Sequence, residues 1–230
     1  MTDAGLATLE AEVTTCRRCP RLVAWREEVA VVKRAAYLEQ EYWGRPIPGF
    51  GDPLASVVLF GLAPAAHGAN RTGRIFTGDR SGDFLFSALH RTGFANQPTS
   101  VSRDDGLELT GAWVTCGVRC APPANKPTPE ERDTCIMSWA VPELQLLPNV
   151  RVLLCLGAFA WDAALRVLAL DGAQIPRPKP RFGHGAEAAV GAYTLLGCFH
   201  PSQQNTFTGV LTPPMLDGVL ERARELSLSR

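Results

Sequence analysis

Two pairs of cysteines have the spacing of metal ligands. Cys16 and Cys19 are separated by two residues, and Cys120 and Cys135 by fourteen. A Cys-x2-Cys pair chelates an ion from a single turn, and the second pair brackets a proline-rich loop and a helix start. Four thiolates suit zinc or an iron–sulfur cluster, and the residue types leave both open. We predict one four-cysteine metal site. Buried structural thiols are the better interpretation for the cysteines of the apolar runs, Cys116, Cys155 and Cys198.

The glycine-rich segment 61–82 also carries groups with specific chemistry. It follows the apolar run 57–60, contains Phe76 and Asp79, and precedes a helical segment. Long irregular segments inside a compact domain are usually functional or disordered. We predict that this segment forms the floor of an active site.

The elements that must position these residues alternate along the chain. Apolar runs at 57–61, 112–116, 150–157 and 193–199 are separated by helical segments at 81–92, 128–147 and 158–170, and another helical segment follows at 213–226. Strands that are apolar on both faces predict an α/β fold with a parallel sheet covered on both sides. Ligands of such sheets bind beyond the carboxyl ends of the strands. Three of the four apolar runs are followed there by the chemically richest segments, which predicts one shared cleft.

Composition sets limits on the partners. Of the 230 residues, 46% are hydrophobic and 20% charged, which allows a sizeable core. Lys plus Arg and Asp plus Glu both number 23, so polyanion binding must come from a local patch. The first 15 residues lack the apolar stretch of a secretory signal, and no apolar run reaches the length of a membrane helix. We expect a soluble, intracellular protein without a membrane partner.

Three motifs resemble the uracil-DNA glycosylase superfamily. They are Gly61-Leu62-Ala63-Pro64-Ala65, the run from Gly73 to Gly82, and His200-Pro201-Ser202-Gln203-Gln204-Asn205-Thr206. The segment from Cys120 to Glu130 is similar to its iron–sulfur branches, and the first and last motifs look most like the family 5 (B type) enzymes. The resemblance covers the chain from Cys16 to Gly209.

This resemblance implies a three-layer α/β/α sandwich with a central four-stranded parallel sheet, as one domain over residues 1–230. It implies a [4Fe–4S] cluster on Cys16, Cys19, Cys120 and Cys135. It also implies excision of uracil, and of other deaminated bases such as hypoxanthine, from DNA. We expect a monomer that acts in the cytoplasm at the nucleoid.

The resemblance also implies roles for residues that have simpler interpretations. Asp79 takes the catalytic position, and a helix N-cap is its alternative; Asp83 is a rival acid. His200 is implied to donate a hydrogen bond to the base, although a lone histidine at a strand end is more often structural. Asn125 is implied to act in catalysis, with an Asx-turn as an equal alternative. Phe76 is expected to stack on the base rather than pack in the core.

Further residues are expected to line the pocket or contact DNA. Gly61, Ala63 and Ala65 are predicted to line the pocket through backbone groups. The predicted contacts to the DNA backbone are Arg71, Arg74, Ser202, Gln203, Gln204, Asn205 and Thr206, with a basic loop at Arg177, Lys179 and Arg181. Any single charged residue among them is more often a solvated charge than a phosphate contact.

The sequence departs from the related family 4 enzymes at two positions. An acidic residue of the first motif is replaced by Ala63, and a base-reading Asn is replaced by Cys116. Losing that amide predicts looser selectivity for uracil. Two rival hypotheses stay open at this point: a nucleic-acid-binding or electron-transfer module built around its cluster, and a zinc-dependent hydrolase. All-cysteine ligation weakens the hydrolase, because it leaves no open catalytic position on the metal.

Overall fold

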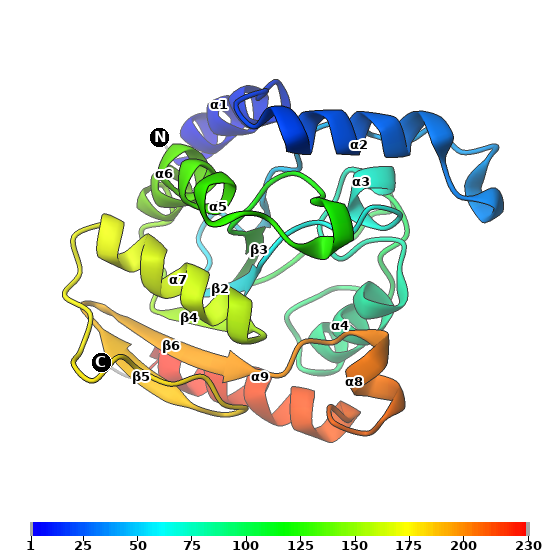
Figure 1. The fold of residues 1–230 in the computed structure, drawn as a ribbon. Helices are drawn as coiled ribbons and strands as arrows, with labels where there is room; N and C mark the ends of the chain where they lie inside the picture. Colours follow the sequence, from blue (N-terminus) through cyan, green and yellow to red (C-terminus); the bar gives the residue numbers. More distant parts are fainter. Residues whose placement is uncertain (1, 229–230) are drawn as a thin grey trace.

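The parallel sheet predicted from the sequence is the centre of the molecule (Figure 1). We describe a computed structural model of residues 2–228. Within this range one six-stranded sheet has the order β1-β3-β2-β4-β6-β5. Its strands are β1 (Phe50–Gly51), β2 (Val57–Gly61), β3 (Ala112–Cys116), β4 (Val152–Leu156), β5 (Glu187–Val190) and β6 (Tyr193–Cys198).

The four central strands β3, β2, β4 and β6 are mutually parallel, as predicted. Every residue of β2, β3 and β4 is buried, because helices cover both faces of the sheet. The two edge strands β1 and β5 pair antiparallel and were not predicted. Both are short, and β5 is largely exposed, so neither carries the continuous apolar run that marks the central strands.

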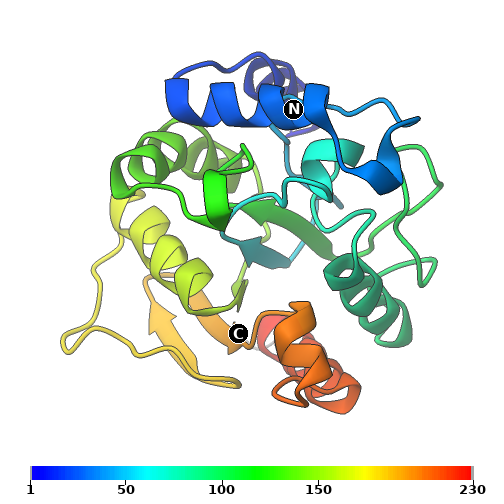
Figure 2. The same ribbon diagram turned by 45° about the vertical axis from the view of Figure 1, so that its right-hand side comes forward.

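The helices form the outer two layers (Figures 1 and 2). On one face α4 (Arg80–Arg91) and α9 (Pro213–Leu228) pack against each other and the sheet. The other face is covered by α7 (Ala158–Leu170) and by α5 (Pro129–Cys135), the π-turn η3 (Ile136–Ala140) and α6 (Val141–Gln145). The predicted α/β/α layering is confirmed.

Local sequence explains where the helix after Cys120 begins and where it changes pitch. Thr128 caps α5 in a capping box with Glu131, as Thr-Pro-Glu-Glu predicts. The helix was predicted to run to about residue 147 and to tolerate or kink at Pro142; the π-turn η3 divides it, ending two residues before Pro142. Proline lacks the N–H that continues the α-helical ladder, so the irregular turn precedes it.

Two N-terminal helices lie along one end of the sheet, α1 (Thr2–Thr14) and α2 (Pro20–Val32). The link between them carries the first cysteine pair, and Leu9, Val13 and Leu22 pack with Cys120 and Cys135 in a small separate core. The remaining short elements are η1 (Ala35–Tyr37), α3 (Ala69–Thr72), η2 (Pro123–Asn125) and α8 (Gln203–Phe207). None of the helices within residues 2–228 combines the length and apolar character needed to cross a membrane.

Candidate active site

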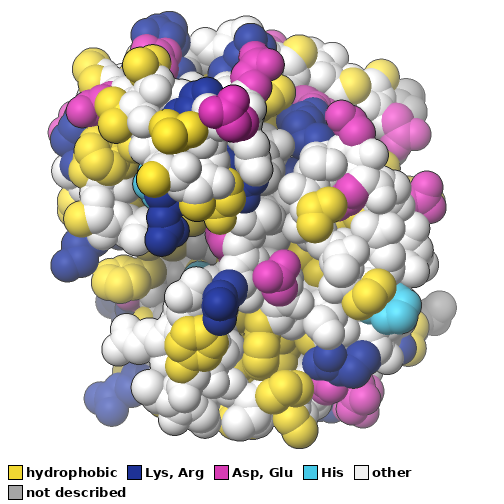
Figure 3. All heavy atoms as spheres, turned by 90° about the vertical axis from the view of Figure 1, so that its right-hand side faces the viewer, with side chains coloured by type: hydrophobic (Ala, Val, Ile, Leu, Met, Phe, Trp, Pro, Cys, Tyr) yellow, Lys and Arg dark blue, Asp and Glu magenta, His cyan; other side chains and the backbone are white. Residues whose placement is uncertain are grey.

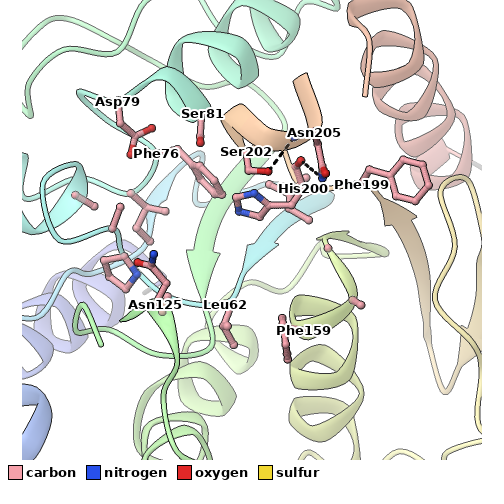
Figure 4. Close-up of a pocket in the computed structure, with 18 of the residues that line it drawn as sticks. Leu62, Phe76, Asp79, Ser81, Asn125, Phe159, Phe199, His200, Ser202 and Asn205 are labelled. Atoms are coloured by element: carbon pink, nitrogen blue, oxygen red, sulfur yellow. Dashed lines mark hydrogen bonds between the residues drawn. The ribbon is translucent and has the colours of Figure 1, made fainter. Parts of the chain in front are cut away.

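A pocket of about 510 Å³ lies at the carboxyl ends of the four parallel strands (Figure 4). Its lining comes from the segments that follow all of them: Leu62 after β2, Asn125 after β3, Gly157 after β4 and His200 after β6. The topology therefore brings together three segments that the sequence singled out, as the rule for parallel sheets predicts.

Asp79 is both a helix cap and a wall of this pocket. Its Oδ1 accepts a hydrogen bond from the backbone N–H of Gly82 at 2.9 Å, which makes it the N-cap of α4. Burial raises the pKa of Asp79 above its ordinary value, and the N–H groups of Gly82 and Ser81 oppose that shift. The two interpretations of this residue are therefore compatible. The rival acid, Asp83, lies exposed in the first turn of α4.

Phe76 and His200 face each other in the pocket, with ring centroids 6.0 Å apart and planes inclined at 41°. Phe76 has φ of 53°, so the chain turns sharply there and brings the ring into the cavity. Two glycines make room for the ring and the backbone of Phe76. A Cβ at Gly61 would lie 3.4 Å from the Phe76 ring, and one at Gly82 would lie 1.8 Å from the Phe76 carbonyl oxygen.

His200 is held by the loop that follows it. Asn205 donates its Nδ2–H to the His200 carbonyl at 2.8 Å, and the backbone N–H of Asn205 donates to Ser202 Oγ at 3.4 Å. Burial lowers the pKa of His200 to about 4. The imidazole is therefore neutral at physiological pH and presents one N–H donor and one acceptor.

Asn125 reaches the pocket from a strained turn. Ala124 and Asn125 have φ of 52° and 55°, the left-handed conformation that asparagine tolerates better than most residues. The Asn125 side chain makes no hydrogen bond with any residue in 2–228, so the Asx-turn alternative is wrong. Figure 4 shows its amide directed into the cavity.

The pocket also contains residues that sequence reasoning missed. They lie at the end of β4, just after it, or on neighbouring loops, and they are Leu156, Gly157, Ala158, Phe159, Phe182 and Phe199. Phe159 is 70% exposed at the mouth. The sequence signal that could have identified them is the end of the third predicted strand. The segment after that strand lies at the same edge of the sheet as the other pocket segments, although it lacks polar side chains.

Three of the predicted site residues need correction. Gly61 does not line the pocket but lies beneath the Phe76 ring, whereas Ala63 and Ala65 do line it. Arg74 is only 6% exposed and is engaged by Asp105 at 2.6 Å, so it is not a contact to DNA. Arg71 donates to three acceptors within the protein, and its guanidinium is likewise not free for a phosphate.

The other predicted DNA contacts differ in availability. Ser202 caps α8, and Asn205 and Thr206 are half-buried in that turn. Gln203 and Gln204 are exposed, as are the side chains of the basic loop, Arg177, Lys179 and Arg181. Lys179 is paired with Asp162 at 2.6 Å. The exposed members of the set stay predictions as DNA contacts.

The four paired cysteines line one small cavity beside α2 and α5, although the two pairs are about a hundred residues apart in the chain. Among residues 2–228, no three His, Cys, Asp or Glu side chains are grouped closely enough to hold a single metal ion. Burial raises the pKa of Cys120 to about 11 and that of Cys135 to about 12. Cys116, Cys155 and Cys198 are buried in the sheet, as predicted.

Two buried arginines contact the second cysteine pair. The Arg26 guanidinium donates to Cys120 Sγ at 2.9 Å and to the Cys16 carbonyl at 3.1 Å. The backbone N–H of Arg119 donates to Cys135 Sγ at 3.2 Å. The side chain of Arg119 forms a buried ion pair with Glu143 at 2.7 Å. Arg26 has only Glu27 as an acidic neighbour, at 3.8 Å, and its Nε has no partner within residues 2–228.

Comparison with known proteins assigns the family. A family model described as the uracil DNA glycosylase superfamily matches residues 48–224, which contain the pocket residues described above. The chain belongs to the uracil-DNA glycosylase superfamily.

Individual relatives place the chain within this superfamily. The Type-5 uracil-DNA glycosylase of Mycobacterium tuberculosis is 55% identical over 225 residues, covering 97% of this chain and 82% of that protein. That of Thermus thermophilus is 52% identical over 216 residues, covering 94% and 95%. The Type-4 uracil-DNA glycosylase of Pyrobaculum aerophilum is 27% identical over 183 residues, covering 79% and 81%. The resemblance to the type-5 branch of the uracil-DNA glycosylases is confirmed.

Proposed function

We propose that this uracil-DNA glycosylase superfamily member excises uracil from DNA by hydrolysing the bond between the base and C1′ of the deoxyribose, which starts base excision repair. One observation carries the proposal. A carboxylate, a neutral imidazole and an aromatic ring converge on one cavity of a size that suits a small ligand, at the edge of a parallel sheet.

The pocket is suited to a base that has left the DNA stack. Enzymes that act on a base extrude the nucleotide and hold the base in a pocket, at a cost of a few kcal/mol. The Phe76 ring supplies a stacking surface, and the aliphatic and aromatic lining replaces the apolar neighbours that the base loses. His200 presents an N–H donor to a carbonyl oxygen of the base.

Asp79 acts on the sugar side of the bond. Cleavage leaves positive charge on the sugar and negative charge on the departing base. The Asp79 carboxylate stabilises the positive charge or orients the attacking water, and the neutral His200 stabilises the base anion through a hydrogen bond. Asn125, with its free amide, holds the base or the water.

The substrate range extends to other deaminated bases, hypoxanthine among them. Cys116, which occupies the place of a base-reading amide, is fully inside the sheet and does not line the pocket. Within the first motif, Ala63 lines the pocket, and its side chain offers no hydrogen bond to the base. Selection of the base then depends on shape and on the few polar groups of the lining.

Cys16, Cys19, Cys120 and Cys135 hold a [4Fe–4S] cluster in this proposal. The residues fit such a group in two ways. First, four sulfur donors line one cavity. Second, the buried guanidinium of Arg26 has an unpartnered Nε, and the negative charge of cluster thiolates would compensate its positive charge. The cluster orders the Cys16 turn and the Cys120 loop, and the reaction itself proceeds on the pocket residues.

DNA binding relies on local groups in this proposal. Figure 3 shows basic and acidic side chains interspersed over one face of the molecule, which agrees with a net charge of zero. Gln203, Gln204 and the exposed basic loop contact the DNA backbone. The protein acts as a monomeric, single-domain enzyme in the cytoplasm, at the nucleoid.

The deciding experiment is single-turnover excision from end-labelled duplex DNA with one uracil, read as an abasic site after alkali treatment. We expect Asp79→Asn and His200→Ala to lower the rate by roughly 10²-fold or more. Asp83→Asn is the matched control, because that carboxylate is exposed and outside the pocket. Parental rates in both pocket variants would show that the site assignment is wrong.

The alternative is an iron–sulfur or zinc module that binds nucleic acid without cleaving it. Its outcome in the same assay is intact uracil DNA at every enzyme concentration, together with a mobility shift of the duplex. Iron and sulfide analysis with the visible absorption spectrum separates the two metals: a brown protein supports the cluster, and a colourless protein with stoichiometric zinc excludes it.

A further inference from the structure

The sequence suggested Arg71 as a contact to DNA, but in the structure its half-buried guanidinium is engaged by groups of the protein instead. Nε–H donates to the His67 carbonyl at 2.9 Å, Nη2–H to the Gly78 carbonyl at 2.5 Å, and Nη1–H to Gln40 Oε1 at 2.6 Å. The guanidinium also lies over the Tyr37 ring, 4.0 Å from its centroid. All three nitrogen atoms are therefore used within the protein.

The two backbone carbonyls that Arg71 holds belong to residues adjacent in the chain to Asp79 and to Gly68, the glycine beside its carboxylate. Gly78 is the residue immediately before Asp79. His67 immediately precedes Gly68, where an added Cβ would lie 2.1 Å from Asp79 Oδ2. The guanidinium thus joins the backbone that precedes Asp79 to the backbone against which its carboxylate rests.

These hydrogen bonds of Arg71, called the Arg71 clamp below, are joined by further contacts from the segment 37–44. Tyr37 and Gln40 belong to the segment after α2, and the same segment donates backbone N–H groups from Trp43 to the Arg71 carbonyl at 2.9 Å and from Gly44 to the Asn70 carbonyl at 3.0 Å. Tyr42 Oη lies 3.1 Å from His67 Nδ1. The segment 37–44 therefore braces the loop that carries Asp79.

We propose that Arg71 is a positioning residue for the glycosylase reaction, which sets the place of the Asp79 carboxylate. The inference rests on the proposed function. A carboxylate that stabilises a developing positive charge must be fixed within a fraction of an ångström, and displacement by about 1 Å costs on the order of 10²-fold in rate. A planar fork that donates along three directions gives that rigidity, which lysine does not reproduce.

Charge is the second part of the role. The charged groups facing Asp79 are Arg71 from α3, which lowers its pKa, and Asp83 from α4, which raises it. His200, across the pocket, is neutral. Removing the Arg71 charge therefore raises the pKa of Asp79 further, so the ionised form is lost at a higher pH.

The test compares Arg71→Met and Arg71→Lys with Arg103→Met. Arg103 is the matched control, since it also clamps the segment, through the Gly73 carbonyl at 3.2 Å and the Trp43 ring, but contacts neither His67 nor Gly78. Single-turnover excision is measured against pH, and affinity is measured on duplex carrying 2′-fluoro-2′-deoxyuridine, whose glycosidic bond resists cleavage. The thermal midpoint confirms folding.

We expect Arg71→Met to lower the excision rate at least about tenfold, to leave DNA affinity within about twofold, and to shift the acidic limb of the profile to higher pH. Arg71→Lys keeps the charge, so its limb stays near that of the parent while its rate falls. Arg103→Met keeps both the parental excision rate and the parental acidic limb. Weaker DNA binding at an unchanged rate in Arg71→Met would overturn the proposal and restore Arg71 as a phosphate contact.

A second readout separates this inference from the proposed function. The pKa of Asp79 is followed directly by ¹³C NMR of its side-chain carboxyl carbon in the parent, Arg71→Met and Arg71→Lys proteins. A higher pKa in Arg71→Met supports the clamp even if the parent excises no base, in which case the proposed function alone fails. An unchanged pKa and an unchanged carboxyl shift in both variants would refute the clamp.

Discussion

Gly68→Ala is a single added methyl group aimed at the Asp79 carboxylate. An ideal Cβ at Gly68 would lie 2.1 Å from Asp79 Oδ2 and 3.3 Å from Ala65 Cβ. Cβ contacts under 3.0 Å are essentially never found, so the carboxylate must retreat by about 1 Å. The cap hydrogen bond from Gly82 resists that movement, because it ties Oδ1 to the first turn of α4.

The size of the effect follows from that displacement. A misplacement of about 1 Å in a catalytic group costs on the order of 10²-fold, equivalent to about 2.7 kcal/mol of lost transition-state stabilisation. The assay is single-turnover excision of uracil from duplex DNA, with affinity measured separately. Gly218→Ala is the control, since that glycine is exposed on α9 and an added Cβ meets nothing within 4 Å.

A double-mutant cycle tests whether the methyl group acts through Asp79. If it does, Gly68→Ala added to Asp79→Asn costs little more than Asp79→Asn alone, because the carboxylate is already gone. Two results would refute the reasoning: a parental rate in Gly68→Ala with its fold intact, or a further 10²-fold loss in the Asp79→Asn background.

Four further predictions concern pH, stability and the proposed cofactor. The excision rate falls with decreasing pH through a pKa above 3.8, because burial raises the pKa of Asp79 and only its carboxylate is active; a pH profile of single-turnover rates checks this. The raised pKa also means that the ionised Asp79 opposes folding at neutral pH, so Asp79→Asn, with an equally good N-cap, unfolds at the same or higher urea concentration. Glu143→Gln leaves the Arg119 guanidinium buried without its counter-charge and destabilises the fold by about 3–5 kcal/mol in urea titration. The proposed cluster predicts that Arg26→Gln releases iron to a chelator roughly 10- to 100-fold faster than the parent protein, whereas Arg21→Gln, which breaks an ion pair on the surface of the same helix, releases it at the parental rate.

The sequence by itself determined the fold class and the edge of the sheet where the pocket lies. Apolar runs alternating with helical segments require a covered parallel sheet, and its carboxyl ends lie on one side by geometry. The start of one helix was also predictable from local sequence. Thr128 caps α5 as predicted, because a helix cap depends on residues within one turn. The edge strands β1 and β5 were not predicted. Strand β1 has only two residues and pairs with β3, far along the chain, whereas β5 pairs with the adjacent β6 but is short and largely exposed, so neither carries a continuous apolar run.

Only the tertiary structure decided what individual side chains of segment 61–82 do. Arg71, Arg74 and Asp79 are all charged residues of this segment, and residue type does not distinguish a surface charge from a buried one. The partners that distinguish them, Gln40 for Arg71 and Asp105 for Arg74, lie about thirty residues away along the chain. Desolvation makes each buried charge depend on such partners, so roles in this segment are set by contacts that no local pattern encodes.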